Sequence, residues 1–202
     1  LYDDIEGWQN KQCLGAEEFT LVFGNYDVSL TVPDDHIVVA TGTLQNTKDI
    51  LSKEQLARFE KAKTEYTTPV VIVTEDEARE NEKEKGKGEK TWRFKADNVR
   101  DFAFATSRKF IWDAMSVKQS NGSNVLAMSA YPKEANPLWG QFSTKAIAHT
   151  LKWYSHYTFD YPYPVAISVE AANGMEYPMI CFNNGRVEKD GTYSERTKYG
   201  TI

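Results

Sequence analysis

Apolar and polar residues alternate along the first half of the chain. From residue 26 to residue 32 every second side chain is apolar, and Asp27, Ser29 and Thr31 stand between them. A period of two puts the apolar side chains on one face of a β-strand and the polar ones on the other. Further β-like segments, bounded by turn residues, lie at 36–40, 91–95, 101–105 and 110–112. Several short strands separated by turn signals predict a β-sandwich.

Two other patterns in this half predict local structure. Ser52 and Gln55 have the spacing of a capping box, so we expect a short helix to begin there and to bury Leu56 and Phe59. The run 69–73 consists of a proline followed by four apolar β-branched residues. A strand that is apolar on both faces is typical of the interior of a sheet, so this run predicts an internal strand.

The segment 75–90 differs from its surroundings in composition. Twelve of its sixteen residues are charged, seven acidic and five basic, and it contains Gly86 and Gly88 but no aromatic residue. Such a stretch buries little apolar surface, which is what orders a chain. Its charges are mixed in sign, so it predicts a solvated hairpin or loop rather than an interaction tail.

A helical period appears after the polar segment 119–123, which we expect to link two domains. A strand is predicted at 125–131, and the spacing from 142 to 157 predicts a long amphipathic helix. The apolar stripe of this helix comprises Phe142, Ala146, Thr150, Trp153 and Tyr157, with Ile147, Leu151 and Tyr154 beside it. Prolines at 162 and 164 end it, and strands are expected at 165–169 and within 173–182. The predicted domains are residues 1–122, a β-sandwich, and residues 123–202, an α+β unit.

Charge and composition exclude several classes of protein. The 202 residues include 24 Lys and Arg against 29 Asp and Glu, a formal net charge of −5. Nucleic-acid binding needs a basic surface, so no nucleic-acid partner is expected. No apolar run approaches the ~18 residues that cross a bilayer. Two cysteines, Cys13 and Cys181, are not spaced as a metal knuckle or a redox pair, which favours two free or buried thiols.

Common catalytic signatures are missing from the sequence. His149 and His156 lie seven residues apart on the predicted helix, about 10.5 Å along its axis, too far to bind one metal ion. His36 is distant from both in sequence, so each histidine is expected at a surface or an interface. The 202 residues contain neither a His-Glu-x-x-His pair nor a Gly-x-Ser-x-Gly nucleophile elbow.

One constellation remains, at residues 173–178. Glu176 stands in a β-like segment that follows Gly174 and precedes Pro178. Because proline cannot donate a hydrogen bond to a neighbouring strand, this segment is expected at a sheet edge. An exposed edge can bind an extended peptide as an added strand, Gly174 leaves room for its backbone, and a carboxylate there can pair with its terminal ammonium. The alternative is a turn followed by an exposed glutamate without a function.

The same stretch carries a family resemblance. Gly174-Met175-Glu176 resembles the core of the Gly-x-Met-Glu-Asn motif of the zinc aminopeptidases of the aminopeptidase N and leukotriene hydrolase family. The order of the surrounding segments is similar to that family too: 28–33, 40–44 and 99–104 upstream, then 144–157, 161–164 and 165–169. Asn173 stands where the motif usually has Gly, and Tyr177 where it usually has Asn. The variant Gly-Met-Glu-Tyr-Pro resembles a bacterial subgroup.

The resemblance implies a fold and a function. The fold would be most of an N-terminal β-sandwich domain followed by the beginning of a thermolysin-like catalytic domain of the gluzincin type. The function would be hydrolysis of N-terminal residues from peptides, with zinc held by a His-Glu-x-x-His helix and a later Glu in the full-length protein. Gly174, Met175 and Glu176 would bind the peptide substrate, Glu176 by its α-amine. The chain would be a fragment that ends before the zinc helix, so it is expected to hold no catalytic residue and no metal and to be inactive alone.

Two other functions fit parts of the sequence. A non-catalytic peptide-binding or scaffold protein would keep this fold and lose the chemistry. A free-standing β-sandwich module for adhesion or carbohydrate binding would explain the first 120 residues but not the helix and motif that follow. The bacterial subgroup also implies an extracytoplasmic location, either periplasmic, secreted or on the cell surface. The side-chain preference, oligomeric state, organism and cysteine redox state do not follow from the sequence.

Overall fold

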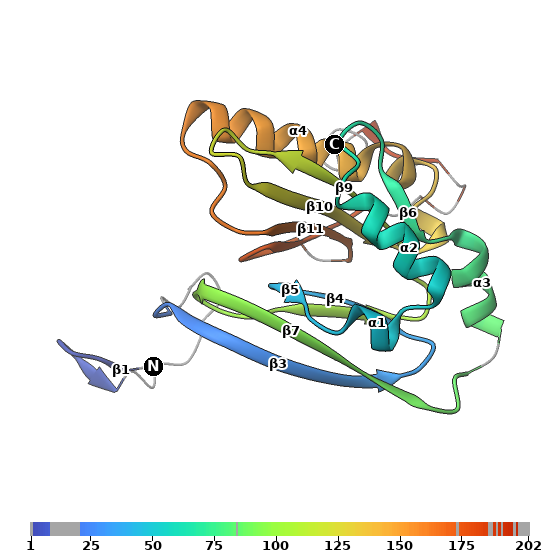
Figure 1. The fold of residues 1–202 in the computed structure, drawn as a ribbon, viewed down its shortest axis with the longest axis horizontal. Helices are drawn as coiled ribbons and strands as arrows, with labels where there is room; N and C mark the ends of the chain where they lie inside the picture. Colours follow the sequence, from blue (N-terminus) through green and yellow to red (C-terminus); the bar gives the residue numbers. More distant parts are fainter. Residues whose placement is uncertain are drawn as a thin grey trace.

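The computed structural model describes residues 2–8, 21–83, 85–172, 174–185, 188, 190, 192–195 and 197. Asn173 and Cys13 therefore lie outside the described residues. Figure 1 shows two layers, with a large sheet and a long helix above and a curved pair of long strands below. The fold is mixed α/β and consists mostly of strands in several sheets. The division into a β-sandwich and a thermolysin-like part remains a prediction.

The lower layer is built from the alternating segments of the first half. Its three-stranded antiparallel sheet has the order β3-β7-β5, and the bounds are β3 (Gly24–Pro33), β7 (Glu89–Val99) and β5 (Thr43–Leu44). A separate antiparallel pair consists of β4 (Ile37–Ala40) and β8 (Phe104–Ser107). The burial of β3 alternates residue by residue, which confirms the strand predicted from 26 to 32. At the N-terminus β1 (Tyr2–Asp3) pairs with β2 (Gly7–Trp8).

The upper layer is a mixed sheet of six strands in the order β12-β13-β11-β10-β9-β6. Its strands are β6 (Val70–Val73), β9 (Ile111–Lys118), β10 (Asn124–Tyr131), β11 (Val165–Glu170), β12 (Met175–Tyr177) and β13 (Ile180–Asn183). The pairs β10·β11 and β11·β13 are parallel and the other three are antiparallel. The long helix α4 (Leu138–Tyr157) packs on the face of this sheet that points away from the lower layer. The short η1 helix (Lys133–Ala135) precedes α4.

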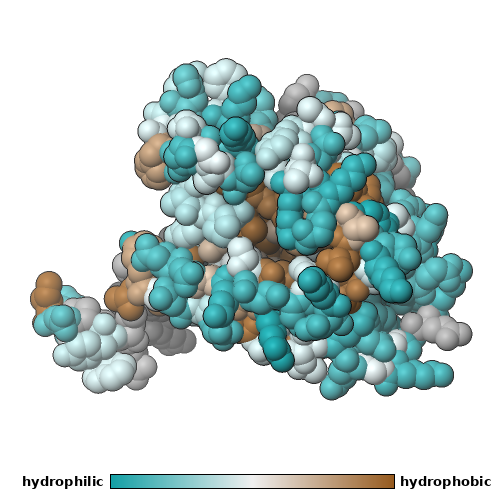
Figure 2. Space-filling view, in the orientation of Figure 1, coloured by the Kyte–Doolittle hydropathy of each residue, from teal (hydrophilic) through white to brown (hydrophobic). Residues whose placement is uncertain are grey.

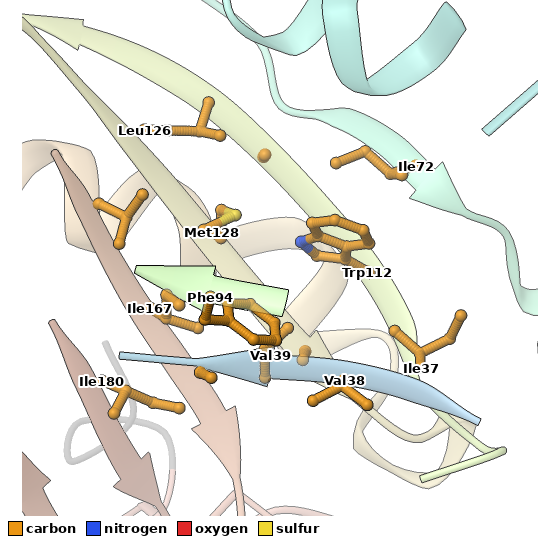
Figure 3. Packing of buried hydrophobic residues seen from close by; sticks show 14 of the residues in the cluster. Ile37, Val38, Val39, Ile72, Phe94, Trp112, Leu126, Met128, Ile167 and Ile180 are labelled. Carbon is orange, nitrogen blue, oxygen red and sulfur yellow. The ribbon is translucent and has the colours of Figure 1, made fainter. Parts of the chain in front are cut away.

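The main core fills the space between the layers. Figure 3 shows Phe94 of β7 and Val38 and Val39 of β4 packed beneath Met128 and Trp112 of the upper sheet. Most of the molecular face in Figure 2 is hydrophilic, and its hydrophobic side chains gather in the band between the two layers. A cavity of about 360 Å³ lies in this core and is lined mostly by apolar residues. Burial of this band holds the two layers together.

The segment 119–123 joins β9 and β10 as a tight hairpin turn. The Gln119 backbone N–H donates to the Ser123 carbonyl at 2.9 Å, and Gly122 N–H donates to Gln119 O at 3.1 Å. Gly122 has a φ of 86°, which favours glycine. The six-stranded sheet therefore contains strands from both sides of the predicted domain boundary at residue 122. The assignment of residues 1–122 and 123–202 to two domains remains a prediction.

The charged segment 75–90 is not a loop throughout, and that prediction is wrong. Residues Glu75–Lys83 form helix α3. The hydroxyl of Thr74 accepts a hydrogen bond from Glu77 N–H at 3.2 Å, and the Thr74 N–H donates to Glu77 Oε2 at 2.7 Å. This reciprocal cap and the acidic first turn stabilise the helix N-terminus. The high charge of this segment drew attention to its solvation, and the capping pattern of Thr74 and Glu77 was overlooked.

Two smaller helices lie between β5 and β6. Helix α1 (Thr47–Ile50) is followed by α2 (Lys53–Ala62). The predicted capping box of α2 is confirmed, because Ser52 Oγ accepts from Gln55 N–H at 3.1 Å and Gln55 Oε1 accepts from Ser52 N–H at 3.2 Å. Phe59 is buried and Leu56 packs against the core, as expected.

Two predictions about burial are wrong. Strand β6 is at an edge of the sheet rather than inside it, and α2 packs against it. Helix α4 begins four residues earlier than predicted, and its expected core stripe is largely exposed, with Phe142 43%, Trp153 40% and Tyr157 75% accessible. The buried residues are the apolar Leu138, Trp139 and Leu151, the last of which was expected beside the stripe, together with Ser143 and Thr144, whose hydroxyls find partners in the sheet. Apolarity alone misassigns a helix face when buried polar groups are satisfied.

Candidate functional site

The segment around Glu176 forms the outermost strand of the upper sheet. Strand β12 pairs antiparallel with β13, with Glu176 opposite Cys181, and no other described strand pairs with it. The prediction of an edge strand is therefore confirmed. An unpaired strand edge presents backbone N–H and C=O groups to solvent and can accept a further extended chain.

A two-residue turn connects β12 to β13. Pro178 and Met179 occupy its central positions, and Met179 has a φ of 67°. Proline followed by a left-handed residue is the pattern of a type II turn, in which the second position normally takes glycine or asparagine. The Met179 carbonyl accepts a hydrogen bond from Ile167 N–H at 2.8 Å, and the Pro178 carbonyl accepts one from the Thr41 hydroxyl at 3.0 Å.

Gly174 and Met175 leave the strand open to solvent. A Cβ on Gly174 would meet nothing closer than the Phe182 carbonyl oxygen, at 3.9 Å. Met175 is 45% exposed. Among the described residues, apart from its chain neighbours, none is therefore close enough to require a glycine at 174. Tyr177, two residues after Met175 in the same strand, packs edge-on against Phe182, with ring centroids 6.0 Å apart.

Glu176 begins a row of polar side chains that crosses the sheet. Residues paired in register project from the same face, and five strands contribute one residue each. In order from the edge inward these are Glu176, Cys181, Ser168, Ser129 and Asp113. The face is the one covered by α4, since Ser129 Oγ lies 2.8 Å from Ser143 Oγ of that helix. Glu176 is exposed at one end of the row, and Asp113 is 3% exposed at the other.

Asp113 is held in a buried hydroxyl network. Tyr131 OH donates to its Oδ2 at 2.7 Å and Thr144 Oγ1 donates to its Oδ1 at 2.5 Å. Thr144 Oγ1 also lies 2.7 Å from Ser129 Oγ. Burial raises the pKa of Asp113 to about 6, although the two hydroxyl donors lower it. Burial and the nearby Asp113 charge also raise the pKa of Tyr131.

A groove of about 500 Å³ lies between α4 and the outer strands of the sheet. Ser168, Cys181 and Asn183 line its sheet side, and Ile147, Thr150 and Tyr154 of α4 are among its other lining residues. Cys181 is a free thiol in β13 whose pKa is raised by burial, so it is a weak nucleophile at neutral pH. The Asn183 amide donates to Ser168 Oγ at 2.8 Å and to Cys181 Sγ at 3.3 Å.

The described residues do not by themselves supply a zinc site. No group of three His, Cys, Asp or Glu side chains in the described ranges is placed to hold a metal ion. His149 and His156 are both exposed and lie on either side of Trp153, with ring centroids 6.0 and 5.9 Å from it. His36 hydrogen-bonds Thr106 Oγ1 at 3.0 Å in the lower layer. His149 and His156 therefore lie at the surface, as expected.

Sequence reasoning missed two features of this region. Thr41 comes directly after the β-like segment 36–40, and its contact with Pro178 spans 137 residues, which no local pattern reveals. The buried network of Asp113 was also missed. A lone acidic residue within the apolar run 110–115 was the available signal, because such a residue in a buried strand needs hydrogen-bond donors from elsewhere.

Comparisons of sequence give no relative for this chain. No protein-family model matches it, and no curated protein matches it significantly. No helix among the described residues is both long and apolar enough to cross a bilayer.

Comparisons of structure do find similar proteins. An M1 zinc metallopeptidase from Deinococcus radiodurans is similar with a TM-score of 0.52 and 14% identity, over 89% of this chain and 33% of that one. A two-domain M1 zinc metallopeptidase mutant bound to L-tryptophan has a TM-score of 0.51 and 14% identity over the same shares of the two chains. Legionella pneumophila aminopeptidase A in complex with aspartic acid has a TM-score of 0.50 and 9% identity, over 79% of this chain and 16% of that one.

These likenesses concern the fold, because the identities are far below the level at which function can be transferred. This chain spans a third or less of the length of those proteins. Within that limit, the fold of this chain resembles part of an M1 zinc metallopeptidase.

Proposed function

We propose that this chain is part of a zinc-dependent aminopeptidase and that β12 is the strand along which its peptide substrate lies. The observation that carries the proposal is the position of Glu176. It is an exposed carboxylate on a three-residue strand at the edge of the sheet, and it is paired in register with Cys181, which lines the groove beside α4. The fold likeness to M1 zinc metallopeptidases supports the same assignment.

The proposed recognition uses two kinds of contact. Backbone groups at Gly174 and Met175 bond to an extended peptide, which adds itself to the sheet as a further strand. The Glu176 carboxylate pairs with the free α-ammonium of that peptide, so only a chain that ends there is held in register. A charge-assisted hydrogen bond of this kind contributes about 1.5–3 kcal/mol. Zinc in the full-length protein would supply the activated water for hydrolysis, and the chain's own residues bind and orient the peptide.

The decisive experiment is Glu176→Gln in the full-length protein. It removes the charge and keeps the shape, so kcat/KM for peptides with a free amine falls about tenfold to a hundredfold. Cleavage of N-acetylated peptides, if there is any, stays unchanged. Glu60→Gln on α2 is the matched control, because Glu60 is an exposed carboxylate that pairs with Lys63 on its own helix. Unchanged kinetics in Glu176→Gln contradict the assignment.

The rival function is a non-catalytic peptide-binding or scaffold protein with the same fold. It predicts that Glu176→Gln weakens peptide binding and that the full-length protein hydrolyses no peptide bond. The gene sequence that follows residue 202 separates the two, since a His-Glu-x-x-His helix belongs to the enzyme. An extracytoplasmic location is part of the enzyme proposal and is tested by fractionating cells that express the full-length protein.

A further inference from the structure

The turn that follows the candidate peptide-binding strand is strained. Met179 has a positive φ although it is not glycine, and a side chain in this region of the Ramachandran plot is disfavoured. Strained backbone persists where surrounding contacts hold it in place, and it clusters at functional sites. The turn is also close to Glu176, since only Tyr177 lies between Glu176 and Pro178.

Three contacts hold this turn. The Met179 side chain is 4% exposed and belongs to the main core. The Met179 carbonyl accepts from Ile167 N–H of the neighbouring strand β11. The third contact comes from the other layer of the molecule, where Thr41 Oγ1 donates to the Pro178 carbonyl at 3.0 Å.

Thr41 is itself fixed on every side. It is fully buried, its hydroxyl also accepts from Ala103 N–H at 3.1 Å, and its N–H donates to the Ala103 carbonyl at 2.9 Å. The next residue, Gly42, has a φ of 94° and packs against the backbone of β7, where a Cβ would lie 2.2 Å from the Lys95 carbonyl oxygen. The hydroxyl of Thr41 therefore has one position, with both its donor and its acceptor function in use.

We infer that Thr41 is a positioning residue for Glu176, which it places by holding the turn at Pro178. The inference rests on the proposed function of Glu176. Strand β12 has only three residues and, among the described strands, pairs with β13 alone, so its place is set by β13 and by the turn. The hydroxyl of Thr41 ties that turn to the lower layer, and Glu176 sits two residues away from the tie.

The test is a double-mutant cycle in the full-length protein, with a peptide that has a free amine as substrate. Thr41→Val keeps the shape and removes both hydrogen bonds, so KM rises about tenfold while kcat changes little. Thr41→Ser restores the hydroxyl and keeps KM within about twofold of the natural protein. In Glu176→Gln the same Thr41→Val change has no further effect on KM, because Thr41 acts through that carboxylate.

Thr106→Val is the control, because its hydroxyl contacts His36 in the same layer and takes no part in the hydrogen bonds described for the turn. Equal losses in Thr41→Val and Thr106→Val, or additive losses in the double variant, overturn the inference and leave the function of Glu176 standing. An unchanged KM in Thr41→Val also overturns it. If Glu176→Gln itself has no effect, the proposed function fails first.

A second measurement covers the case in which Thr41→Val lowers stability. Hydrogen exchange of the 202-residue chain reports the opening of β12 and β13 directly. Faster exchange confined to residues 174–183 in Thr41→Val, with Thr106→Val unchanged there, supports the inference. Uniformly faster exchange across both layers overturns it.

Discussion

Asp113 and Glu176 stand in the same row of the six-stranded sheet, one buried beneath α4 and the other exposed at the sheet edge. Three in-register residues lie between them. The two carboxylates share one face and differ in environment, because α4 covers the inner half of that face and leaves the outer half as a groove. The buried one affects stability, and the exposed one is free to meet a ligand.

Asp113 makes stability depend on pH in an unusual direction. Its pKa is about 6 in the folded protein and near 3.8 in an unfolded chain, so the folded state binds the proton more tightly. The stabilisation from this protonated carboxyl is fully present below about pH 4 and is lost as the pH rises through 6. Its full size is about 3 kcal/mol.

Asp113→Asn removes this titration. The difference in free energy of unfolding between the natural chain and Asp113→Asn shifts in favour of the variant by about 2–3 kcal/mol from pH 4 to pH 7. Urea unfolding at four pH values measures it. Ser29→Ala, at an exposed position on β3, removes no titratable group and is the control. A flat difference for Asp113→Asn across this range contradicts the assignment.

Gly42 and Gly122 form a natural pair for testing close approach. Both have positive φ, at 94° and 86°, but a Cβ on Gly42 would lie 2.2 Å from the Lys95 carbonyl oxygen, whereas one on Gly122 meets nothing within 4 Å. Gly122→Ala is expected to cost about 1 kcal/mol from conformation alone. Gly42→Ala is expected to cost at least about 2 kcal/mol more, because backbone must move. If urea unfolding gives equal losses of free energy of unfolding for the two variants, the close approach of Gly42 to the Lys95 carbonyl does not affect stability.

Thr74 caps helix α3, which the charged composition of segment 75–90 led us to predict as a loop. Thr74→Ala removes the acceptor for Glu77 N–H, and about 1 kcal/mol of stability should be lost. Thr68→Ala, at an exposed position before β6, serves as the comparison and is expected to stay within about 0.5 kcal/mol of the natural chain. A loss in Thr74→Ala no greater than in Thr68→Ala would mean that α3 does not depend on this cap.

The proposed function also predicts what the 202-residue chain does alone. We expect it to bind no stoichiometric zinc and to release no chromophore from aminoacyl substrates, because its described residues bring no three metal ligands together. Metal analysis after dialysis and a standard chromogenic assay measure both. One zinc per chain, or hydrolysis above the level of a Glu176→Gln preparation, contradicts the expectation.

Local signals in the sequence predicted local structure well. The alternation along β3 and the Ser52–Gln55 cap depend on neighbours within a few residues, and both are confirmed. The edge position of β12 was predicted on the assumption that Pro178 lies within the strand; the position is confirmed, but Pro178 belongs to the turn that follows, so the reason was wrong. The prediction that β6 is an internal strand, made from its apolar composition, failed because an apolar strand at a sheet edge can be covered by a packed helix, here α2.

The parts that were not predicted depend on distant partners. The buried face of α4 carries Ser143 and Thr144, and only the sheet residues Ser129 and Asp113 make that burial acceptable. The hydrogen bond between Thr41 and Pro178 joins the two layers, and neither sequence segment contains a pattern that predicts it. The resemblance in motif order pointed to the fold. The contact from the lower layer that supports the strand of Glu176 could be found only in the three-dimensional structure.

The tie across 137 residues also sets an order of assembly. A contact between such distant residues forms late, because a long loop must close before the contact can stabilise anything. The lower-layer strands and the hairpin β9–β10 are complete in sequence long before residue 178 is synthesised. The edge that we propose for peptide binding therefore takes its final place among the last parts of the molecule, after the scaffold that must hold it.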